Sequence, residues 1–261
     1  MKPELAVLIV GYGSSSDVEA CLDSVAAQEG VSVETIVVDN GGAGVERRDA
    51  RLISNRENVG WARAMHQAAE ASTAPALVLL NPDCRLKPGA LAAVRDALAA
   101  PGREKTGIVG GRLFFEDGAA QPSCGPFPHL GNLLWRLALP AVRRRYYLSE
   151  PRPGASVDWV TGAFLAVRRE AWDAIGGLDR DFFLYYEDVD LCLRAWKAGW
   201  GVCYIPESQA VHAKPYASRR GRAPASLKRT IQDSRMRYFD KHRPSWERAV
   251  LRALHAVEPL A

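Results

Sequence analysis

The chain has 261 residues, of which 48% are hydrophobic and 25% are charged, as in an ordinary globular protein. That length is enough for one domain with a sizeable core, and no apolar run of about 18 residues predicts a membrane-spanning helix. Five scattered cysteines without a C-x-x-C pair indicate free buried thiols and argue against a zinc site. The N-terminus lacks the features of a signal peptide, so we expect a cytoplasmic protein.

The charge is distributed unevenly along the chain. The net charge is +4, yet the segment from His212 to the end contains twelve Lys or Arg and four Asp or Glu, a net of +8 that leaves −4 for the rest. A basic tail suggests an anionic partner, such as a phosphate-bearing ligand, a lipid surface or a nucleic acid, although on charge alone a solvated helix face is the favoured explanation. We therefore expect a domain over residues 1–212 and a basic helical tail over 213–261 that packs on or near it.

The first half of the chain alternates strand and helix patterns. Leu5–Val10 is a continuous apolar run, typical of a strand buried on both faces. Ser16 and Glu19 have the spacing of a capping box at a helix start. Further strands are predicted over 33–39, 51–54, 76–80 and 107–110, with helices over about 61–71 and 88–99. This alternation indicates an α/β fold with a mostly parallel central sheet and helices on both faces.

The second half has a less regular pattern. Residues 116–156 are rich in Pro, Gly and Arg, with one amphipathic stretch over Leu130–Val142. The elements predicted beyond them are strands over 157–161, 164–167 and 201–205, a helix over 187–197, and tail helices over 225–241 and 246–257. One domain with a helical tail is the simplest interpretation.

A glycine-rich turn follows the first strand. Gly11 and Gly13, with Asp39 at the end of the second strand, nearly form a dinucleotide fingerprint, but Ser16 replaces the third glycine. No phosphate-binding G-x-x-x-x-G-K-[ST] loop occurs. Tyr12 and Asp39 are still expected at the carboxyl edge of the sheet, where open α/β sheets bind nucleotides. A turn in which Asp39 bonds its own backbone is the alternative.

Five short motifs then follow in a fixed order. Asn58-Val59-Gly60-Trp61-Ala62 opens a helix, Asn81-Pro82-Asp83 ends a buried strand, and GAFLAVRR begins at Gly162; FFLYYEDVDLC begins at Phe182, and Ala210-Val211-His212 closes the series. With VVDN upstream, residues from about Leu5 to His212 closely resemble the family 2 glycosyltransferases, particularly the rhamnosyltransferase-like branch. Two positions depart from that pattern, since Gly13 and His66 stand where many members have asparagine.

The resemblance implies a GT-A fold, a nucleotide-diphosphate sugar donor, a divalent metal (Mn²⁺ or Mg²⁺) and inversion at the anomeric carbon. It assigns Asp83 and His212 to the metal and Asp188 to the catalytic base. It also implies a donor site built from the following residues: Tyr12, Asp39, Asn58, Gly60, Trp61, Asn81 and Asp83.

The chemistry of the acidic stretch agrees with these roles. A cation neutralises the charge that grows on a diphosphate leaving group, while a carboxylate takes the proton of the acceptor hydroxyl. Asp188 is our candidate for that base, and Glu187 for a helper that holds the acceptor or a neighbouring backbone amide. Asp190 is expected to pair with Arg194, at i+4, or with one of the arginines at 168 and 169. Trp159, Thr161 and Gly162 are expected on the acceptor side, with core packing as the alternative for Trp159.

We thus predict a cytoplasmic hexosyltransferase that uses dTDP-L-rhamnose or a similar donor and a glycan, lipid-linked or small-molecule acceptor. Leu130–Val142 and the following RRRYY would give peripheral contact at the inner face of a membrane, and no nucleic acid is expected. In the tail, Arg235, Arg237 and Lys241 would reach a diphosphate or a lipid, or would simply be solvated. The alternatives are a homologue that binds nucleotide sugar without transfer, and a Rossmann-type oxidoreductase.

Overall fold

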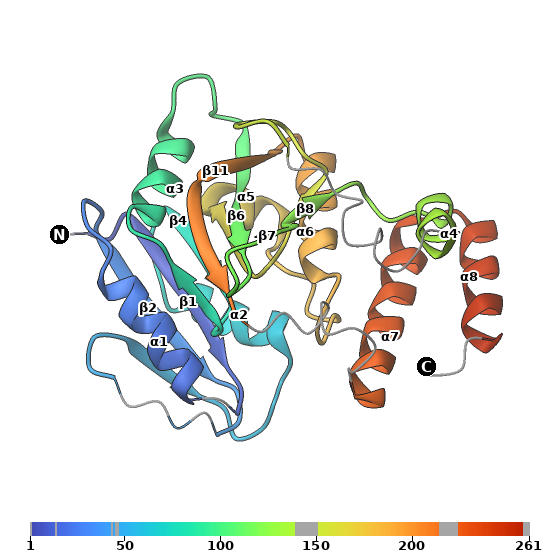
Figure 1. Ribbon diagram of the computed structural model, residues 1–261, viewed down its shortest axis with the longest axis horizontal. Helices are drawn as coiled ribbons and strands as arrows, with labels where there is room; N and C mark the ends of the chain where they lie inside the picture. Colours follow the sequence, from blue (N-terminus) through green and yellow to red (C-terminus); the bar gives the residue numbers. More distant parts are fainter. Residues whose placement is uncertain are drawn as a thin grey trace.

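A computed structural model describes residues 2–13, 15–42, 44, 47–138, 151–213 and 224–257 (Figure 1). It is built on a mixed sheet with the strand order β3-β2-β1-β4-β10-β6-β11-β5. The parallel part comprises β1 (Leu5–Gly11), β2 (Val33–Asp39), β3 (Arg51–Ser54) and β4 (Ala76–Leu80). Their apolar runs are explained by burial, because every residue of β1 and β4 is buried.

The other half of the sheet reverses direction. β10 (Phe164–Arg168) lies antiparallel between β4 and β6 (Thr106–Phe114). β11 (Gly201–His212) runs parallel to β6 and carries the short antiparallel strand β5 (Cys84–Leu86) at its far end. Three further strands are short: β7 (Ala120–Gln121) pairs with β6, while β8 (Cys124–Gly125) and β9 (Trp159–Val160) form a separate ladder.

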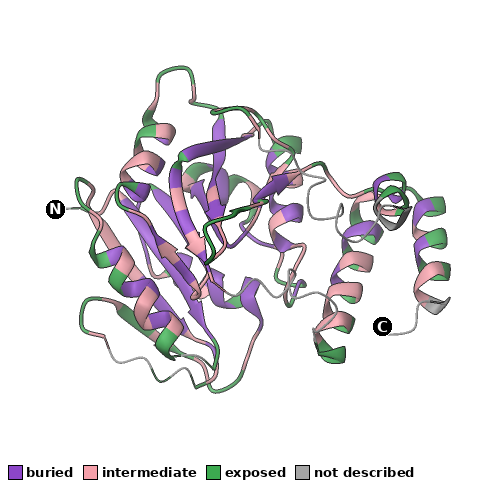
Figure 2. Cartoon of the chain, viewed as in Figure 1, coloured by how far each residue is buried: buried purple, intermediate pink, exposed green. Residues whose placement is uncertain are grey.

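Helices cover both faces of the sheet, as alternate residues of β1 show. Leu5, Val7 and Ile9 pack with α1 (Ser15–Ala26) and α3 (Ala90–Ala99), whereas the residues between them face α2 (Trp61–Glu70), α5 (Arg169–Ile175) and α6 (Glu187–Lys197). All five cysteines are free and buried in these layers, as their scattered positions predicted. Figure 2 shows the buried residues concentrated in the sheet.

A third group of helices lies beside the sheet (Figure 1). It consists of α4 (Leu130–Ala138), α7 (Ala225–His242) and α8 (Ser245–Val257). Its apolar residues form one buried cluster with side chains of the acidic stretch, comprising Leu130, Phe182, Val189, Tyr238, Phe239 and Leu251. Within the described residues, no helix is both long and apolar enough to cross a membrane.

Several predicted boundaries need correction. α1 begins at Ser15, so Ser16 lies inside the helix instead of capping it. β11 continues to His212, well past the predicted end at Ile205, because a register shift near Pro206 interrupts the apolar pattern. The antiparallel β10 makes the sheet mixed, since β9 and a short turn return the chain between β4 and β6. The elements β5, β7, β8 and α5 were not predicted, and residues 139–142 and the RRRYY run lie outside the described residues.

Candidate functional site

The loops after β1 and β2 meet at the carboxyl edge of the sheet. Tyr12 follows β1 with 63% of its surface exposed, and its ring lies over Gly41, close enough to contact a Cβ added there. The carboxylate of Asp39 accepts hydrogen bonds from the N–H groups of Gly41 and Gly44, both at 3.2 Å. Asp39 therefore shapes its own loop, as the turn alternative proposed, beside an exposed aromatic ring.

Asn40 connects this loop to the start of α2. Its Oδ1 accepts hydrogen bonds from the Asn55 side chain at 3.0 Å and from the Val59 N–H at 3.1 Å. Its Nδ2 donates to Asn58 Oδ1 at 2.8 Å, and that oxygen also accepts the Gly60 N–H at 2.9 Å. Asn40 is only 2% exposed. Asn40 was not among the predicted site residues, although its place next to Asp39 in VVDN was a usable signal.

Gly60 and Trp61 attach α2 to the segment that carries the acids. Gly60 has a φ of 89°, and a Cβ there would lie 2.9 Å from the Phe183 ring. The Trp61 N–H donates to the Phe183 carbonyl at 2.8 Å. The Trp61 ring packs against Gly162, where a Cβ would approach it to 3.1 Å. Close backbone approach therefore explains both glycines.

Asp188 lies at the centre of this arrangement. Its Oδ2 accepts the Gly162 N–H at 2.8 Å, its Oδ1 accepts the Val189 N–H at 2.8 Å, and Thr161 adds a side-chain hydrogen bond. The Asn81 N–H donates to the Ala163 carbonyl at 2.9 Å. The turn over 161–163 thus joins Asp188 on one side to the Asn81–Asp83 loop on the other. Trp159 lies before this turn, with its Nε1 bonded to the Pro126 carbonyl at 2.9 Å.

Glu187 and Asp188 are adjacent carboxyls in different surroundings. Burial raises the pKa of Asp188, but its backbone hydrogen bonds favour the ionised form and oppose that effect. Burial and the charge of Asp188 raise the pKa of Glu187 further, because Glu187 is 5% exposed and its Oε2 has no partner among the described residues. The hydrogen bonds of Asp188 therefore favour its ionised form more than the surroundings of Glu187 favour that of Glu187.

Asp83 and His212 come together at the other side of the turn. His212 Nε2 lies 3.3 Å from Asp83 Oδ1, and β11 pairs His212 with Cys84 of β5. The Asp83, Cys84 and His212 ligand atoms all lie within 4.8 Å of one another. The Cys84 thiol is buried, which raises its pKa well above the usual value, and it donates to the Ala163 carbonyl at 3.2 Å. Asp83 and His212 offer a carboxylate and an imidazole, a donor pair that suits Mn²⁺.

Gln121 of β7 contacts the other nitrogen of His212. Its Nε2 lies 3.0 Å from His212 Nδ1, while its buried Oε1 has no partner among the described residues. If the Gln121 amide is turned by 180°, its Oε1 can accept the Nδ1–H of His212. The lone pair of His212 Nε2 then points toward Asp83. Metal-binding histidines usually donate their second N–H to such an acceptor. The residues present therefore fit a divalent cation.

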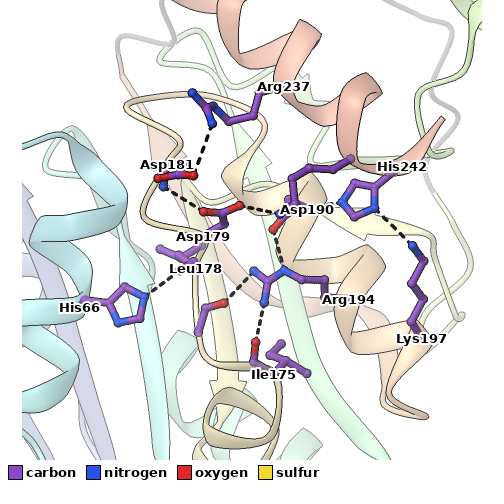
Figure 3. Close-up of polar contacts among 12 residues, drawn as sticks. His66, Ile175, Leu178, Asp179, Asp181, Asp190, Arg194, Lys197, Arg237 and His242 are labelled. Carbon is purple, nitrogen blue, oxygen red and sulfur yellow. Dashed lines mark hydrogen bonds and ion pairs between the residues drawn. The ribbon is translucent and has the colours of Figure 1, made fainter. Parts of the chain in front are cut away.

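Asp190 has a different role from its two acidic neighbours, and Figure 3 shows its contact with Arg194. Its side chain is 0% exposed and bonds Arg194 at 2.7 Å, as the i+4 spacing predicted. The alternative arginines bond backbone carbonyls instead, Arg168 that of Leu98 and Arg169 those of Ala69, Ser72 and Ala74. Two further partners of Asp190, Lys241 at 2.6 Å and His242 at 2.7 Å, come from α7.

Several basic residues in the described part of the tail contact other residues of the protein. Arg237 pairs with Asp181 at 3.4 Å, Lys241 pairs with Asp179 at 2.5 Å, and Arg235 contacts His255. His66, one of the two departures from the family pattern, bonds the Leu178 carbonyl at 2.7 Å through Nε2 (Figure 3). Burial lowers the pKa of His66, and its ring packs on Trp172, so its contacts are those of a core residue.

Rhamnosyltransferases are among the curated proteins related to this chain. N-acetylglucosaminyl-diphospho-decaprenol L-rhamnosyltransferase of Mycobacterium tuberculosis (strain ATCC 25618 / H37Rv) is 30% identical over 280 residues, which cover 97% of this chain and 89% of that protein. Rhamnosyltransferase WbbL of Escherichia coli (strain K12) is 40% identical over 63 residues, 24% of each chain.

Two solved structures share the fold. The mannosyltransferase PcManGT of Pyrobaculum calidifontis, in complex with GDP-Man and Mn²⁺, has a TM-score of 0.61 at 20% identity and covers 97% of this chain and 69% of its own. GalNAc-T7 with UDP, GalNAc and Mn²⁺ has a TM-score of 0.61 at 15% identity, covering 88% of this chain and 47% of its own. Both are GT-A glycosyltransferases, which confirms the predicted GT-A fold.

The family model described as "Glycosyltransferase like family 2" matches residues 3–232. That range includes every motif on which the resemblance rested, from Tyr12 to His212. Together with the long rhamnosyltransferase match, it shows that the chain belongs to the family 2 glycosyltransferases, in their rhamnosyltransferase-like branch.

Proposed function

We propose that the chain is an inverting glycosyltransferase that moves a hexose, L-rhamnose in our first choice, from a nucleotide-diphosphate donor to an acceptor hydroxyl. The observation that carries this proposal is the placement of Asp188. Its carboxylate accepts the Gly162 N–H at 2.8 Å, and the turn over 161–163 joins it to the Asn81–Asp83 loop. The name of the mycobacterial relative supports L-rhamnose as the sugar and a diphospho-decaprenol-linked saccharide as the acceptor.

The donor site uses the carboxyl edge of the sheet. The exposed ring of Tyr12 and the loop ordered by Asp39 provide a surface for the base and ribose, while the Asn40–Asn58 contact keeps the start of α2 in place beside it. Asp83 and His212 would hold a divalent cation. When bound, that cation supplies a Lewis acid for the diphosphate leaving group.

Asp188 takes the proton of the acceptor hydroxyl as that oxygen attacks the anomeric carbon. Its two backbone hydrogen bonds fix the carboxylate, so that it points in one direction without rotating. A single base with attack opposite the leaving group inverts the anomeric centre. Glu187, whose pKa burial raises well above the ordinary carboxyl value, would help to hold the acceptor, and Trp159, Thr161 and Gly162 would lie on the acceptor side.

The test is transfer from dTDP-L-rhamnose to a lipid-linked N-acetylglucosamine diphosphate, with Mn²⁺ or Mg²⁺ and with Asp188→Asn. We expect kcat to fall about 10²–10⁴-fold with donor affinity retained. Asp173→Asn, an exposed carboxyl on α5, is the matched control and should be fully active. Unchanged turnover in Asp188→Asn would refute the base assignment.

Binding measurements beside the transfer assay separate the rival functions. Nucleotide-sugar binding by calorimetry without any transfer would indicate an inactive homologue. Nicotinamide binding without nucleotide-sugar binding would indicate an oxidoreductase. A thermal-shift screen of nucleotide sugars with each cation narrows the donor, because a ligand that binds the native state raises its apparent stability.

Peripheral membrane contact is part of the proposal for a lipid-linked acceptor. It is supported by Trp135 on α4, 56% exposed, and Trp246 on α8, 61% exposed, two aromatic side chains of the kind that sits at lipid interfaces. We expect the protein to sediment with anionic vesicles. Combining Trp135→Ala with Trp246→Ala should lower the fraction of protein that sediments with them. Equal recovery with and without vesicles would contradict membrane contact.

A further inference from the structure

The backbone that leads into the catalytic helix adopts an unfavourable conformation. Tyr185 and Tyr186 have φ values of 71° and 67°, the only non-glycine residues with positive φ in the described part of the chain. Tyr186 is also the N-cap of α6, where no side chain caps the helix. Bulky residues in the left-handed region persist only where the surrounding structure holds them. The question is which part of the protein does so.

On the N-terminal side of Asp188, the contacts come from α7. Ser234 Oγ donates to the Leu184 carbonyl at 2.8 Å, and the ring of Tyr238 packs against that of Tyr186 with centroids 5.7 Å apart. Tyr238 is 0% exposed and belongs to the cluster that encloses Phe182. Both left-handed tyrosines are thus adjacent to positions that α7 contacts.

On the C-terminal side, α7 contacts Asp190, two residues beyond Asp188. Lys241 and His242 share its Oδ1, at 2.6 and 2.7 Å. Arg194 takes its Oδ2 at 2.7 Å and extends to the carbonyls of Ile175 and Gly177, both at 2.7 Å (Figure 3). Lys241 also reaches Asp179 at 2.5 Å, so one ammonium joins the loop before Asp188 to the helix after it.

We infer that α7 is a positioning element of the active site, in which Lys241 and His242, through Asp190, hold Asp188 in the orientation required for proton transfer. This inference rests on the proposed function of Asp188. The two hydrogen bonds to the Asp188 carboxylate come from Gly162 and from Val189 of α6 itself. Asp188 therefore keeps its contact with Gly162 only while α6 keeps its present orientation about its own axis. A tail cation that binds a diphosphate or lipid would instead face solvent, whereas Lys241 and His242 face a carboxylate that is 0% exposed.

The test compares Lys241→Met, His242→Gln and the double variant with the wild type. The readouts are kcat, acceptor KM, and donor affinity by calorimetry. Since a misplacement of about 1 Å can cost about 10²-fold in rate, we expect kcat of the double variant to fall at least about tenfold, with donor affinity unchanged and Lys241→Arg restoring much of the activity. Lys228→Met, on the same helix but outside this cluster, is the matched control and should retain wild-type kcat.

A second readout does not depend on activity. Hydrogen–deuterium exchange of a peptide over 182–192 should accelerate in Lys241→Met, while peptides from β1 and β4 exchange as in the wild type. Global acceleration would reveal a merely structural role and overturn the inference, as would wild-type kcat and exchange in the double variant. A fall in donor affinity parallel to that in kcat would assign Lys241 to donor binding instead.

The two proposals fail in distinguishable ways. If Asp188→Asn is fully active, the base assignment fails and the positioning role fails with it. If Asp188→Asn is inactive while the Lys241 and His242 variants match the wild type, only the positioning role fails. Should the double variant not fold, the single variants Lys241→Met and His242→Gln serve for the same comparison.

Discussion

At the residue scale, Glu187 and Asp188 differ more than their adjacency suggests. We expect kcat/KM to decline as pH falls through the pKa of Asp188, which burial places above the usual carboxyl value, because only the ionised form accepts a proton. A pH–rate profile whose acid limb lies at the ordinary pKa of an exposed aspartate would contradict this expectation.

The raised pKa of Glu187 also predicts how the stability of the protein depends on pH. Its folded-state pKa is raised well above 4.5, so the unfolded state loses its proton first and wild-type stability falls as pH rises from that value toward the folded pKa. Glu187→Gln cannot ionise and should lack this loss, so its stability relative to the wild type increases between pH 4 and pH 8. Urea unfolding at both pH values measures the difference, and a pH-independent difference would show that Glu187 is ionised in the fold.

Gln121 should strengthen metal binding by His212 without contacting the substrate. If its Oε1 accepts the Nδ1–H, Gln121→Met should weaken Mn²⁺ binding about 10–100-fold, since the ring loses the partner that fixes its tautomer. Calorimetry measures the affinity, and long-range nitrogen NMR of His212 in the metal-free protein reports which ring nitrogen carries the proton. Gln232→Met on α7 is the control. Equal affinities in the two variants would exclude this role.

Gly60 supplies a prediction in which two effects can be separated. A Cβ at Gly60 meets both a φ of 89° and the Phe183 ring at 2.9 Å, whereas Gly176, with φ 73°, has nothing within 4 Å of that position. Gly176→Ala should therefore cost about 1–2 kcal/mol from backbone strain alone. Gly60→Ala should cost more and also lower kcat, because α2 and the acidic segment must separate. Equal losses by thermal unfolding would argue against the Phe183 contact.

At the element scale, α6 was predicted with its bounds correct because its acids open the helix and its apolar residues follow a helical period. The length of β11 and the presence of β5 were not predictable from local pattern. Both depend on the pairing of His212 with Cys84, more than a hundred residues apart. Likewise, the i+4 partner of Asp190 was visible in the sequence, but Lys241 and His242 required α7 to be placed. Local spacing reveals contacts within an element, whereas contacts between elements follow from packing.

The cations around Asp190 also predict an acid dependence of stability. Burial alone would raise the pKa of Asp190, but bonds from His242, Arg194 and Lys241 outweigh it and lower the pKa from 3.8 to about 2. The stabilisation, about 2 kcal/mol, is present above pH 4 and is lost as pH falls toward 2. The destabilisation caused by Asp190→Asn should therefore shrink over that range in urea unfolding. A constant difference would show that the ion pairs do not set this pKa.

At the scale of the whole molecule, the division into a domain over 1–212 and a tail over 213–261 remains a prediction. The cluster around Phe182 takes side chains from both parts, and the family match itself extends to residue 232. The order of the motifs was enough to predict the fold and the residues gathered at the carboxyl edge. It did not indicate that the tail packs on the acidic segment, because basic helices look alike in sequence whether their charges face solvent or a buried carboxylate.

The reaction rates of the five buried cysteines can report how often the surrounding parts of the fold open. These cysteines lie on α1, β5, β8, α6 and β11, and burial raises the pKa of the thiols of Cys21, Cys84 and Cys192. A thiol enclosed in this way reacts with an aromatic disulfide only during a local opening, so each reaction rate reports how often its own layer opens. A cysteine introduced on the exposed face of α8 would be the one thiol that a fluorophore labels without such an opening. That label makes the orientation of the tail relative to the sheet measurable in solution.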